Sequence, residues 1–219
     1  MRERAWVSWS SGKDCATALG EARACAKSEV VGLVTTASSR GRVVSHGVPL
    51  ALVERQAAAL GLPLHVVELP SPCPNQEYER RMQGAIDASL SHGVSTWVYG
   101  DLHLADVRAF REQSLVGTGL VADFPLWGRD TARLARTMIA GGLAAILTCV
   151  DPAQLDPSFV GREYDAALLA DLPPGVDPCG ENGEFHTFVH DGPGFTVPIS
   201  VEVGEVVERD GFVYADLLG

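Results

Sequence analysis

The chain has 219 residues, of which 46% are hydrophobic and 21% charged; these values suit a folded globular protein and exclude a disordered one. Its 28 Asp and Glu against 17 Lys and Arg give a formal charge of −11, which disfavours extensive nucleic-acid binding. Its five cysteines form no Cys-x-x-Cys pair, its apolar runs are far shorter than the roughly 20 residues of a membrane helix, and its N-terminus lacks a signal-peptide core. We therefore expect a cytoplasmic protein with free thiols and no membrane partner.

Short apolar runs alternate with helix-forming segments along the first two-thirds of the chain. Runs rich in β-branched residues predict strands at 5–9, 30–35, 64–69, 95–99, 121–126 and 143–150. Helical spacing between turn residues predicts helices at 14–26, 50–60, 77–91, 106–115 and 130–140. This alternation predicts an α/β fold with a doubly wound, mainly parallel sheet, which binds ligands at the carboxyl ends of its strands.

The last third of the chain has a different pattern. A Pro- and Gly-rich loop begins at residue 171, and residues 196–203 and 206–214 alternate like antiparallel strands. We therefore expect a small C-terminal α+β region, and we place the division between residues 1–150 and 151–219.

The loop after the first predicted strand, WSSGKDC at residues 9–15, has the features of a phosphate-binding loop. Small residues let backbone N–H groups converge, the following helix presents its positive dipole end, and Lys13 adds a full charge. It is not a Walker A loop, because Val7 stands where that motif has Gly and Asp14 stands where it has Ser or Thr. A polar turn that caps a helix would give a similar sequence.

A second polar segment, CGENGEFHT at residues 179–187, holds two carboxylates, an amide, two glycines and an imidazole. Loops that concentrate such groups carry function more often than they merely connect strands, although a solvated turn is the alternative. Zinc binding by Cys179, His186 and His190 is not expected, because they give only three ligands in a loop and no paired cysteines.

Both segments resemble one family of enzymes. Residues 10–15 resemble the Ser-Gly-Gly-x-Asp-Ser pyrophosphate loop (PP-loop) of ATP pyrophosphatases. In this chain Ser11 replaces a glycine, which is tolerable if Ser11 keeps an ordinary φ, and Cys15 replaces the final Ser with a weaker donor. Residues 181–187 resemble the Glu-Gly-Gly-Glu-Tyr/Phe-x-Thr stretch of the diphthine–ammonia ligase family, with Asn182 in place of a glycine. With further matches at 100–101, 108, 112, 125–127, 134 and 161–162, the resemblance spans residues 7 to 193.

The resemblance implies an adenine nucleotide α-hydrolase-like fold of the HUP type, with ATP and Mg²⁺ as cofactors. Residues 1–150 would form the PP-loop nucleotide-binding domain and residues 151–219 the substrate-binding region. It further implies adenylation of a carboxylate, release of pyrophosphate, and transfer of ammonia to the acyl group. The expected catalytic residues are Lys13, Asp14, Glu181 and Glu184.

The remaining residues are assigned to binding. Expected to bind ATP and pyrophosphate are Ser10, Ser11, Gly12, Lys13, Asp14, Cys15, His46, Gly100 and Asp101, with Asp14 also a candidate Mg²⁺ ligand. Expected to bind substrate and ammonia are Glu181, Asn182, Gly183, Glu184, His186 and Thr187. We expect the two groups to face each other across one cleft, with the phosphate loop holding the outer phosphates of the nucleotide.

The expected acceptor is diphthine on a translation elongation factor or, in a bacterium without that modification, another carboxylate such as a small molecule. The Ala-rich, Lys-poor composition is typical of a high-GC bacterium. Two alternative functions are a tRNA-modifying PP-loop enzyme, which the charge and the lack of paired cysteines disfavour, and a non-catalytic ATP-binding sensor of the universal-stress type. The sensor would leave the 181–184 segment unexplained. The sequence is also compatible with assembly as a homodimer.

Overall fold

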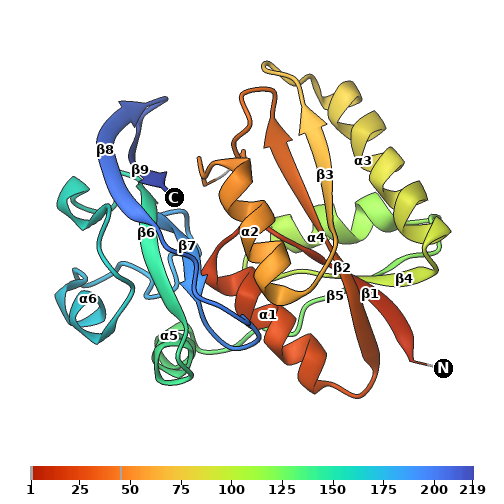
Figure 1. Ribbon diagram of the computed structural model, residues 1–219, viewed down its shortest axis with the longest axis horizontal. Coiled ribbons are helices and arrows are strands. Elements are labelled where there is room, and N and C mark those ends of the chain that lie inside the picture. The colour runs from red at the N-terminus through yellow and green to blue at the C-terminus, as the bar shows by residue number, and fades with distance from the viewer. Residues whose placement is uncertain (1, 45) are drawn as a thin grey trace.

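The computed structural model describes residues 2–44 and 46–219, which form two β-sheets with helices packed against them (Figure 1). The first sheet has five parallel strands in the order β3-β2-β1-β4-β5. They are β1 (Glu3–Ser8), β2 (Ser28–Ser38), β3 (Leu64–Leu69), β4 (Val94–Val98) and β5 (Val121–Asp123). The predicted parallel α/β sheet is thereby confirmed.

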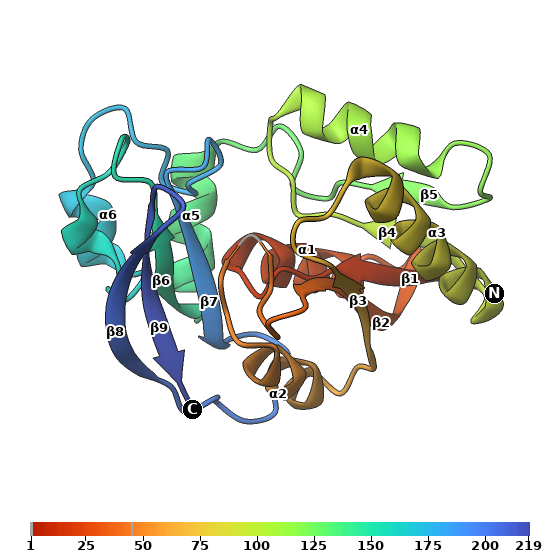
Figure 2. The ribbon, with the colours of Figure 1, turned by 90° about the horizontal axis from the view of Figure 1, so that it is seen from above.

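Helices cover both faces of this sheet, as a doubly wound fold requires (Figure 2). They are α1 (Lys13–Ala24), α2 (Leu50–Leu60), α3 (Asn75–Ser91) and α4 (Ala105–Leu115). Leu19 of α1 and Leu52 of α2 share one apolar core, whereas Ile86 of α3 belongs to a second core on the opposite face. The predicted bounds of α2 are confirmed, because Pro49 precedes its first turn and Gly61 ends it in the left-handed conformation with φ 66°.

The strand order reverses between β1 and β4. The chain leaves β1 for α1 on one face and leaves β4 for α4 on the other, so the two loops diverge at the carboxyl ends of the strands. Such a divergence leaves a crevice in which doubly wound sheets bind their ligands. The phosphate-loop candidate follows β1, and the Gly100-Asp101 pair follows β4.

The second sheet is antiparallel, with the order β7-β6-β9-β8. Its elements and neighbours are α5 (Thr131–Ala140), β6 (Ala144–Val150), a 3-10 turn (Pro157–Phe159), α6 (Ala166–Asp171), β7 (Phe185–Asp191), β8 (Glu202–Arg209) and β9 (Phe212–Leu218). The strand expected at 143–150 is therefore present, but it joins this sheet. A continuous apolar run suits any strand buried on both faces, so its sequence does not identify its neighbours. Because β6 lies in the second sheet, we propose that the division into two parts falls before β6 rather than after residue 150.

The two C-terminal strands differ from their predicted ranges. Residues 196–201 are not in a strand, and the range 206–214 runs across the turn between β8 and β9. Asp210 and Gly211 form that turn, both with positive φ (53° and 83°), the conformation that matches the twist of a two-residue hairpin. The Asp-Gly pair was the local signal for this turn, whereas alternation alone did not place it.

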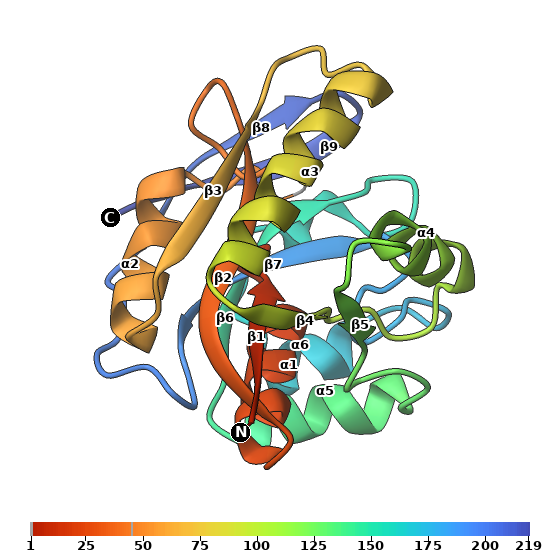
Figure 3. The same cartoon turned by 90° about the vertical axis from the view of Figure 1, so that its right-hand side faces the viewer.

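The two sheets meet where β7 lies beside α1. The backbone N–H of Val189 donates to the carbonyl of Ser11 at 2.9 Å, and the N–H of Lys13 donates to Thr187 Oγ1 at 3.0 Å. Seen from the side of the first sheet, α3 crosses in front of β2, and the second sheet lies behind the first (Figure 3). Within residues 2–44 and 46–219, no helix has both the length and the apolar character required to cross a membrane.

Candidate active site

The phosphate-loop candidate and the segment at 179–187 line one pocket of about 230 Å³ at the carboxyl ends of β1 and β4. The lining residues are Ser8, Ser10, Lys13, Asp14, Cys15, His46, Tyr99, Gly100, Asp101, Leu104, Arg111, Gly180, Glu181, Phe185, His186 and Thr187. The expectation that the two segments face one cleft is confirmed by this lining. Five residues of the predicted site lie outside it: Ser11, Gly12, Asn182, Gly183 and Glu184.

The N-terminus of α1 opens toward this pocket without a side-chain cap, because its cap position is Gly12. A Cβ at Gly12 would lie 2.7 Å from Cε1 of His46, so no larger residue fits there without a shift. The thiol of Cys15 donates to the carbonyl of Gly12 at 3.0 Å, and burial raises its pKa to about 11. Cys15 is therefore a neutral thiol turned into the loop, while the start of the helix keeps its positive dipole end for an anion.

Ser11 does not have the ordinary φ on which the sequence analysis relied. Its φ is 77°, in the left-handed region that favours glycine, and the residue is fully buried. Its hydroxyl has no hydrogen-bond partner among the described residues. The serine at this position therefore keeps the backbone shape of a glycine loop, and its side chain does not reach the pocket.

Replacing Ser11 with Gly is expected to stabilise the protein by about 1 kcal/mol. The change relieves the left-handed strain and removes an unpartnered buried hydroxyl, which together outweigh the greater flexibility of glycine in the unfolded chain. Urea unfolding of both proteins measures the difference. A variant that is clearly less stable than the wild type would contradict the strained conformation.

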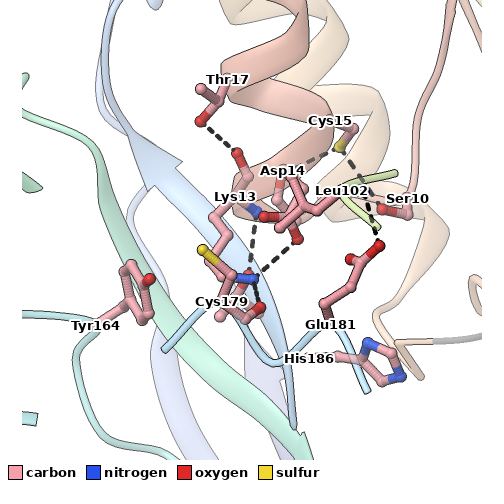
Figure 4. Close-up of polar contacts among 12 residues, drawn as sticks. Ser10, Lys13, Asp14, Cys15, Thr17, Leu102, Tyr164, Cys179, Glu181 and His186 are labelled. Atoms are coloured by element: carbon pink, nitrogen blue, oxygen red, sulfur yellow. Dashed lines mark hydrogen bonds and ion pairs between the residues drawn. The ribbon is translucent and has the colours of Figure 1, made fainter. Parts of the chain in front are cut away.

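Lys13 and Asp14 form an ion pair at the base of the pocket (Figure 4). Lys13 Nζ lies 2.8 Å from Asp14 Oδ2 and also donates to the carbonyl of Cys179, so it links α1 to the C-terminal segment. Its side chain is only 3% exposed. Burial by itself would lower the pKa of Lys13, but Asp14 and other acidic neighbours raise it by a larger amount. The net effect is a pKa above its usual value, so Lys13 stays charged. Burial raises the pKa of Asp14, and the ammonium of Lys13 opposes that effect.

Glu181 reaches from the C-terminal segment to the loop after β4. Its Oε1 accepts a hydrogen bond from the backbone N–H of Leu102 at 2.7 Å (Figure 4) and another from that of His103 at 3.3 Å. Burial raises the pKa of the Glu181 carboxyl, whereas these hydrogen bonds oppose the rise. Glu181 thus lines the pocket with a carboxylate held by both halves of the molecule.

Glu184 has a different place from the one the sequence suggested. It is 2% exposed, and its oxygens accept from the N–H of Asp177 at 2.9 Å and from the N–H and side-chain amide of Asn182, both at 3.0 Å. Gly183 completes this turn with φ 88°. These hydrogen bonds join Glu184 to other residues of its own loop. We therefore propose that Glu184 positions Glu181 and does not contact the substrate.

His46 and His186 form a stacked pair beside the phosphate loop, with ring centroids 4.5 Å apart and planes inclined by 22°. His46 Nδ1 lies 2.9 Å from the carbonyl oxygen of Thr187. Because a carbonyl only accepts, Nδ1 carries the proton and Nε2 keeps a free lone pair. Burial lowers the pKa of His186 to about 4 and that of His46 well below 6.5. Both imidazoles are therefore neutral at pH 7.

Lowering the pH from 7 to 5 is expected to cost about 2 kcal/mol of stability through His186. The unfolded imidazole takes up a proton near pH 6.5 and the folded one only near pH 4, so the unfolded state binds more protons in this window. Stability therefore falls as the pH falls. Denaturant unfolding of wild type and His186→Gln at both pH values measures this, and an identical pH dependence of the two proteins would contradict it.

The end of β4 comes very close to the start of α1. A Cβ at Gly100 would lie 2.8 Å from the carbonyl carbon of Asp14, so glycine is required at this crossing. Asp101 Oδ2 accepts from Arg111 Nε at 2.9 Å, and the Arg111 guanidinium lies 4.7 Å from the ring centre of Tyr99. Sequence reasoning missed Tyr99 and Arg111. The position of Tyr99 directly before Gly100 was a usable signal, but helical spacing did not distinguish Arg111 from its neighbours.

A larger cavity of about 680 Å³ adjoins the pocket. The two share Ser8, Ser10, Tyr99 and Arg111 in their linings. The rest of the larger cavity is mainly apolar and aromatic, with residues such as Val34, Tyr78, Met82, Ile86, Trp97 and Phe110. Apart from Ser10, none of the predicted site residues lines it, because its walls come from several strands and helices far apart in the sequence.

One carboxylate oxygen in the pocket is suited to a divalent cation. Asp14 Oδ1 is buried and has no hydrogen-bond partner among the described residues. Mg²⁺ in nucleotide sites takes one or two carboxylates and completes its shell with phosphate oxygens and water. The donor set at the start of α1 therefore fits a Mg²⁺ that enters with a nucleotide.

Comparison with known proteins finds two matching family models and several curated relatives. The diphthamide synthase N-terminal domain matches residues 3–119, and the diphthamide synthase C-terminal domain matches residues 130–215. The diphthine–ammonia ligases of Bos taurus and Homo sapiens are each 36% identical over 95 residues, and that of Danio rerio is 39% identical over 96. Each alignment covers 41% of this chain and 36 to 37% of the relative, so the match spans little more than a third of those proteins. The N-terminal domain model alone covers more than half of the residues of this chain, and the chain therefore belongs to the diphthamide synthase family.

Proposed function

We propose that this protein is an ATP-dependent ligase that adenylates a carboxylate and then transfers ammonia to it. The observation that carries the proposal is the shared pocket, in which an uncapped helix start faces a half-buried carboxylate and a neutral imidazole. Membership of the diphthamide synthase family supports the same activity, because its curated relatives are named diphthine–ammonia ligases.

The nucleotide would occupy both cavities. Phosphates suit the smaller pocket, where Lys13, Arg111 and the start of α1 supply positive charge. The nucleoside suits the larger cavity, whose aromatic and aliphatic walls can contact a base. Since the cavities share Ser10, Tyr99 and Arg111, the α-phosphate would lie near their junction.

In the first step, a carboxylate oxygen of the acceptor would attack the α-phosphorus, and the bond from that phosphorus to the pyrophosphate oxygen would break. Lys13 and the backbone N–H groups of α1 would bind the departing pyrophosphate. Mg²⁺ held through Asp14 would share the charge of the phosphates. The products of this step are an acyl adenylate and pyrophosphate.

In the second step, ammonia would attack the acyl carbon, a C–N bond would form, and the bond from that carbon to the AMP oxygen would break. The adduct must lose a proton, and two groups lining the pocket can accept it. Glu181 is a carboxylate with a raised pKa, and His186 is a neutral imidazole. We assign to Glu181 the binding of ammonium and acceptance of the proton that turns it into ammonia, and to His186 acceptance of the proton that the adduct loses.

The acceptor would be diphthine on an elongation factor or another carboxylate of a small molecule. The test uses an acceptor labelled with ¹⁸O in its carboxylate, incubated with ATP, Mg²⁺ and ammonium. Adenylation moves one labelled oxygen into AMP, so mass spectrometry should find ¹⁸O in AMP and an amide in the acceptor. Formation of ADP, or unlabelled AMP alongside amide product, would contradict the proposal.

A further inference from the structure

Gln56 is a polar side chain in an otherwise apolar position. It lies on α2, among buried neighbours such as Val53 and Ala57, and is itself fully buried. Burying an amide is costly unless its groups are hydrogen-bonded, so a residue of this kind in a core has a specific set of partners. It lines neither of the two cavities.

Among the described residues, Gln56 has three polar contacts, and all lead to the phosphate loop and the strand beside it. Its Oε1 accepts from Trp9 Nε1 at 2.8 Å. Its Nε2 donates to the carbonyl of Ser11 at 3.0 Å and to that of Val189 at 2.6 Å. One amide therefore joins the end of β1, the loop and β7.

The carbonyl of Ser11 is held from two sides. It accepts from Gln56 Nε2 and, at 2.9 Å, from the N–H of Val189. Ser11 has a φ of 77°, a conformation that costs a residue with a side chain about 1–2 kcal/mol and persists only where its surroundings enforce it. Fixing this carbonyl orients the next peptide units, which lead into the start of α1 at Lys13.

We propose that Gln56 is a positioning residue for the nucleotide phosphates, acting through the left-handed conformation of Ser11. This inference rests on the proposed binding of ATP phosphates by that loop. Glutamate could not replace Gln56, because its ionised carboxylate would face the carbonyls of Ser11 and Val189 without a donor. Methionine would fill similar space and leave Trp9 Nε1 and both carbonyls without this partner.

The test measures binding of Mg²⁺ with α,β-methylene-ATP, which cannot be cleaved between the α- and β-phosphates, by calorimetry. Gln56→Met is expected to weaken binding about tenfold or more. In a Ser11→Gly background the same change should weaken it less than about threefold, because glycine takes the left-handed conformation without help. If Gln56→Met merely loosened the packing, it would weaken nucleotide binding equally in both backgrounds. A smaller loss in the Ser11→Gly background therefore indicates an effect through residue 11.

The matched control is Val53→Ala, which shortens a fully buried side chain of the same helix that lines neither cavity. It should lower stability and leave binding unchanged. If Gln56→Met does not fold, Gln56→Leu, which is also uncharged, is compared in both backgrounds instead. Suppose that the wild type binds the nucleotide and that the Gln56 variant loses affinity equally in both backgrounds, or in neither. Either result would overturn this inference and leave the proposed function standing. No binding by the wild type would overturn the proposed function as well.

Discussion

Replacing Lys13 with Met is expected to abolish AMP formation and to lower the free energy of unfolding by about 3 kcal/mol. The ammonium is almost fully buried, pairs with Asp14 at 2.8 Å and donates to the carbonyl of Cys179. Its removal takes away the charge that would stabilise the departing pyrophosphate. It also leaves Asp14 without its partner and Cys179 without its donor. Pyrophosphate release and urea unfolding measure the two effects.

The double variant Lys13→Met/Asp14→Leu separates catalysis from folding. With both charges gone, no unpaired ion remains, so most of the lost stability should return while AMP formation stays absent. AMP formation by Lys13→Met at the wild-type rate would show that the loop has been assigned wrongly. A double variant no more stable than Lys13→Met would show that the ion pair is not the source of the instability.

Replacing Gly100 with Ala is expected to reduce nucleotide binding by about tenfold to a hundredfold, because a displaced helix start would lose hydrogen bonds to the phosphates, each worth about 1.5–3 kcal/mol. The added Cβ would lie 2.8 to 3.0 Å from three backbone atoms of Asp14 and Cys15. Backbone cannot move aside as a flexible side chain can, so the start of α1 must shift away from β4. Calorimetry with Mg²⁺ and α,β-methylene-ATP measures the loss.

Gly20→Ala is the matched control for this variant. Gly20 lies on α1 itself, but a Cβ there would have no described atom within 4 Å beyond its chain neighbours and the backbone of its own helix. Alanine should stabilise the helix by about 1 kcal/mol and leave binding unchanged. If Gly100→Ala bound the nucleotide as tightly as Gly20→Ala, the close approach of β4 to α1 would not govern the site.

Local signals explain why much of the fold could be predicted. The helix at 50–60 has a proline before it and a glycine after it, and both its bounds are correct. The strand at 64–69 is equally well delimited by Gly61, Pro63 and Pro70. The Asp210-Gly211 turn is an equally clear signal, but the strand predicted at 206–214 runs across it and is therefore misplaced.

Local sequence signals could not predict which strands pair with each other or which side chains are buried. The run at 143–150 reads as a strand, but only its neighbours β7 and β9 assign it to the antiparallel sheet. Glu181 and Glu184 look alike in sequence, three residues apart, yet one lines the pocket and the other braces its own loop. Which carboxylate meets the pocket depends on the turn at Gly183 and on donors from distant segments.

The order of elements up to residue 150 and the two polar segments followed from the amino-acid sequence, because strand periodicity, turn residues and the helix start after a small-residue loop are all properties of neighbouring positions. The helix α6 and the strand β7 were not predicted. The tertiary structure alone decided that Lys13 is buried, that Ser11 is left-handed, and that Arg111 joins two cavities. These features depend on groups brought together from Trp9 to Val189, and no spacing along the chain encodes such distances.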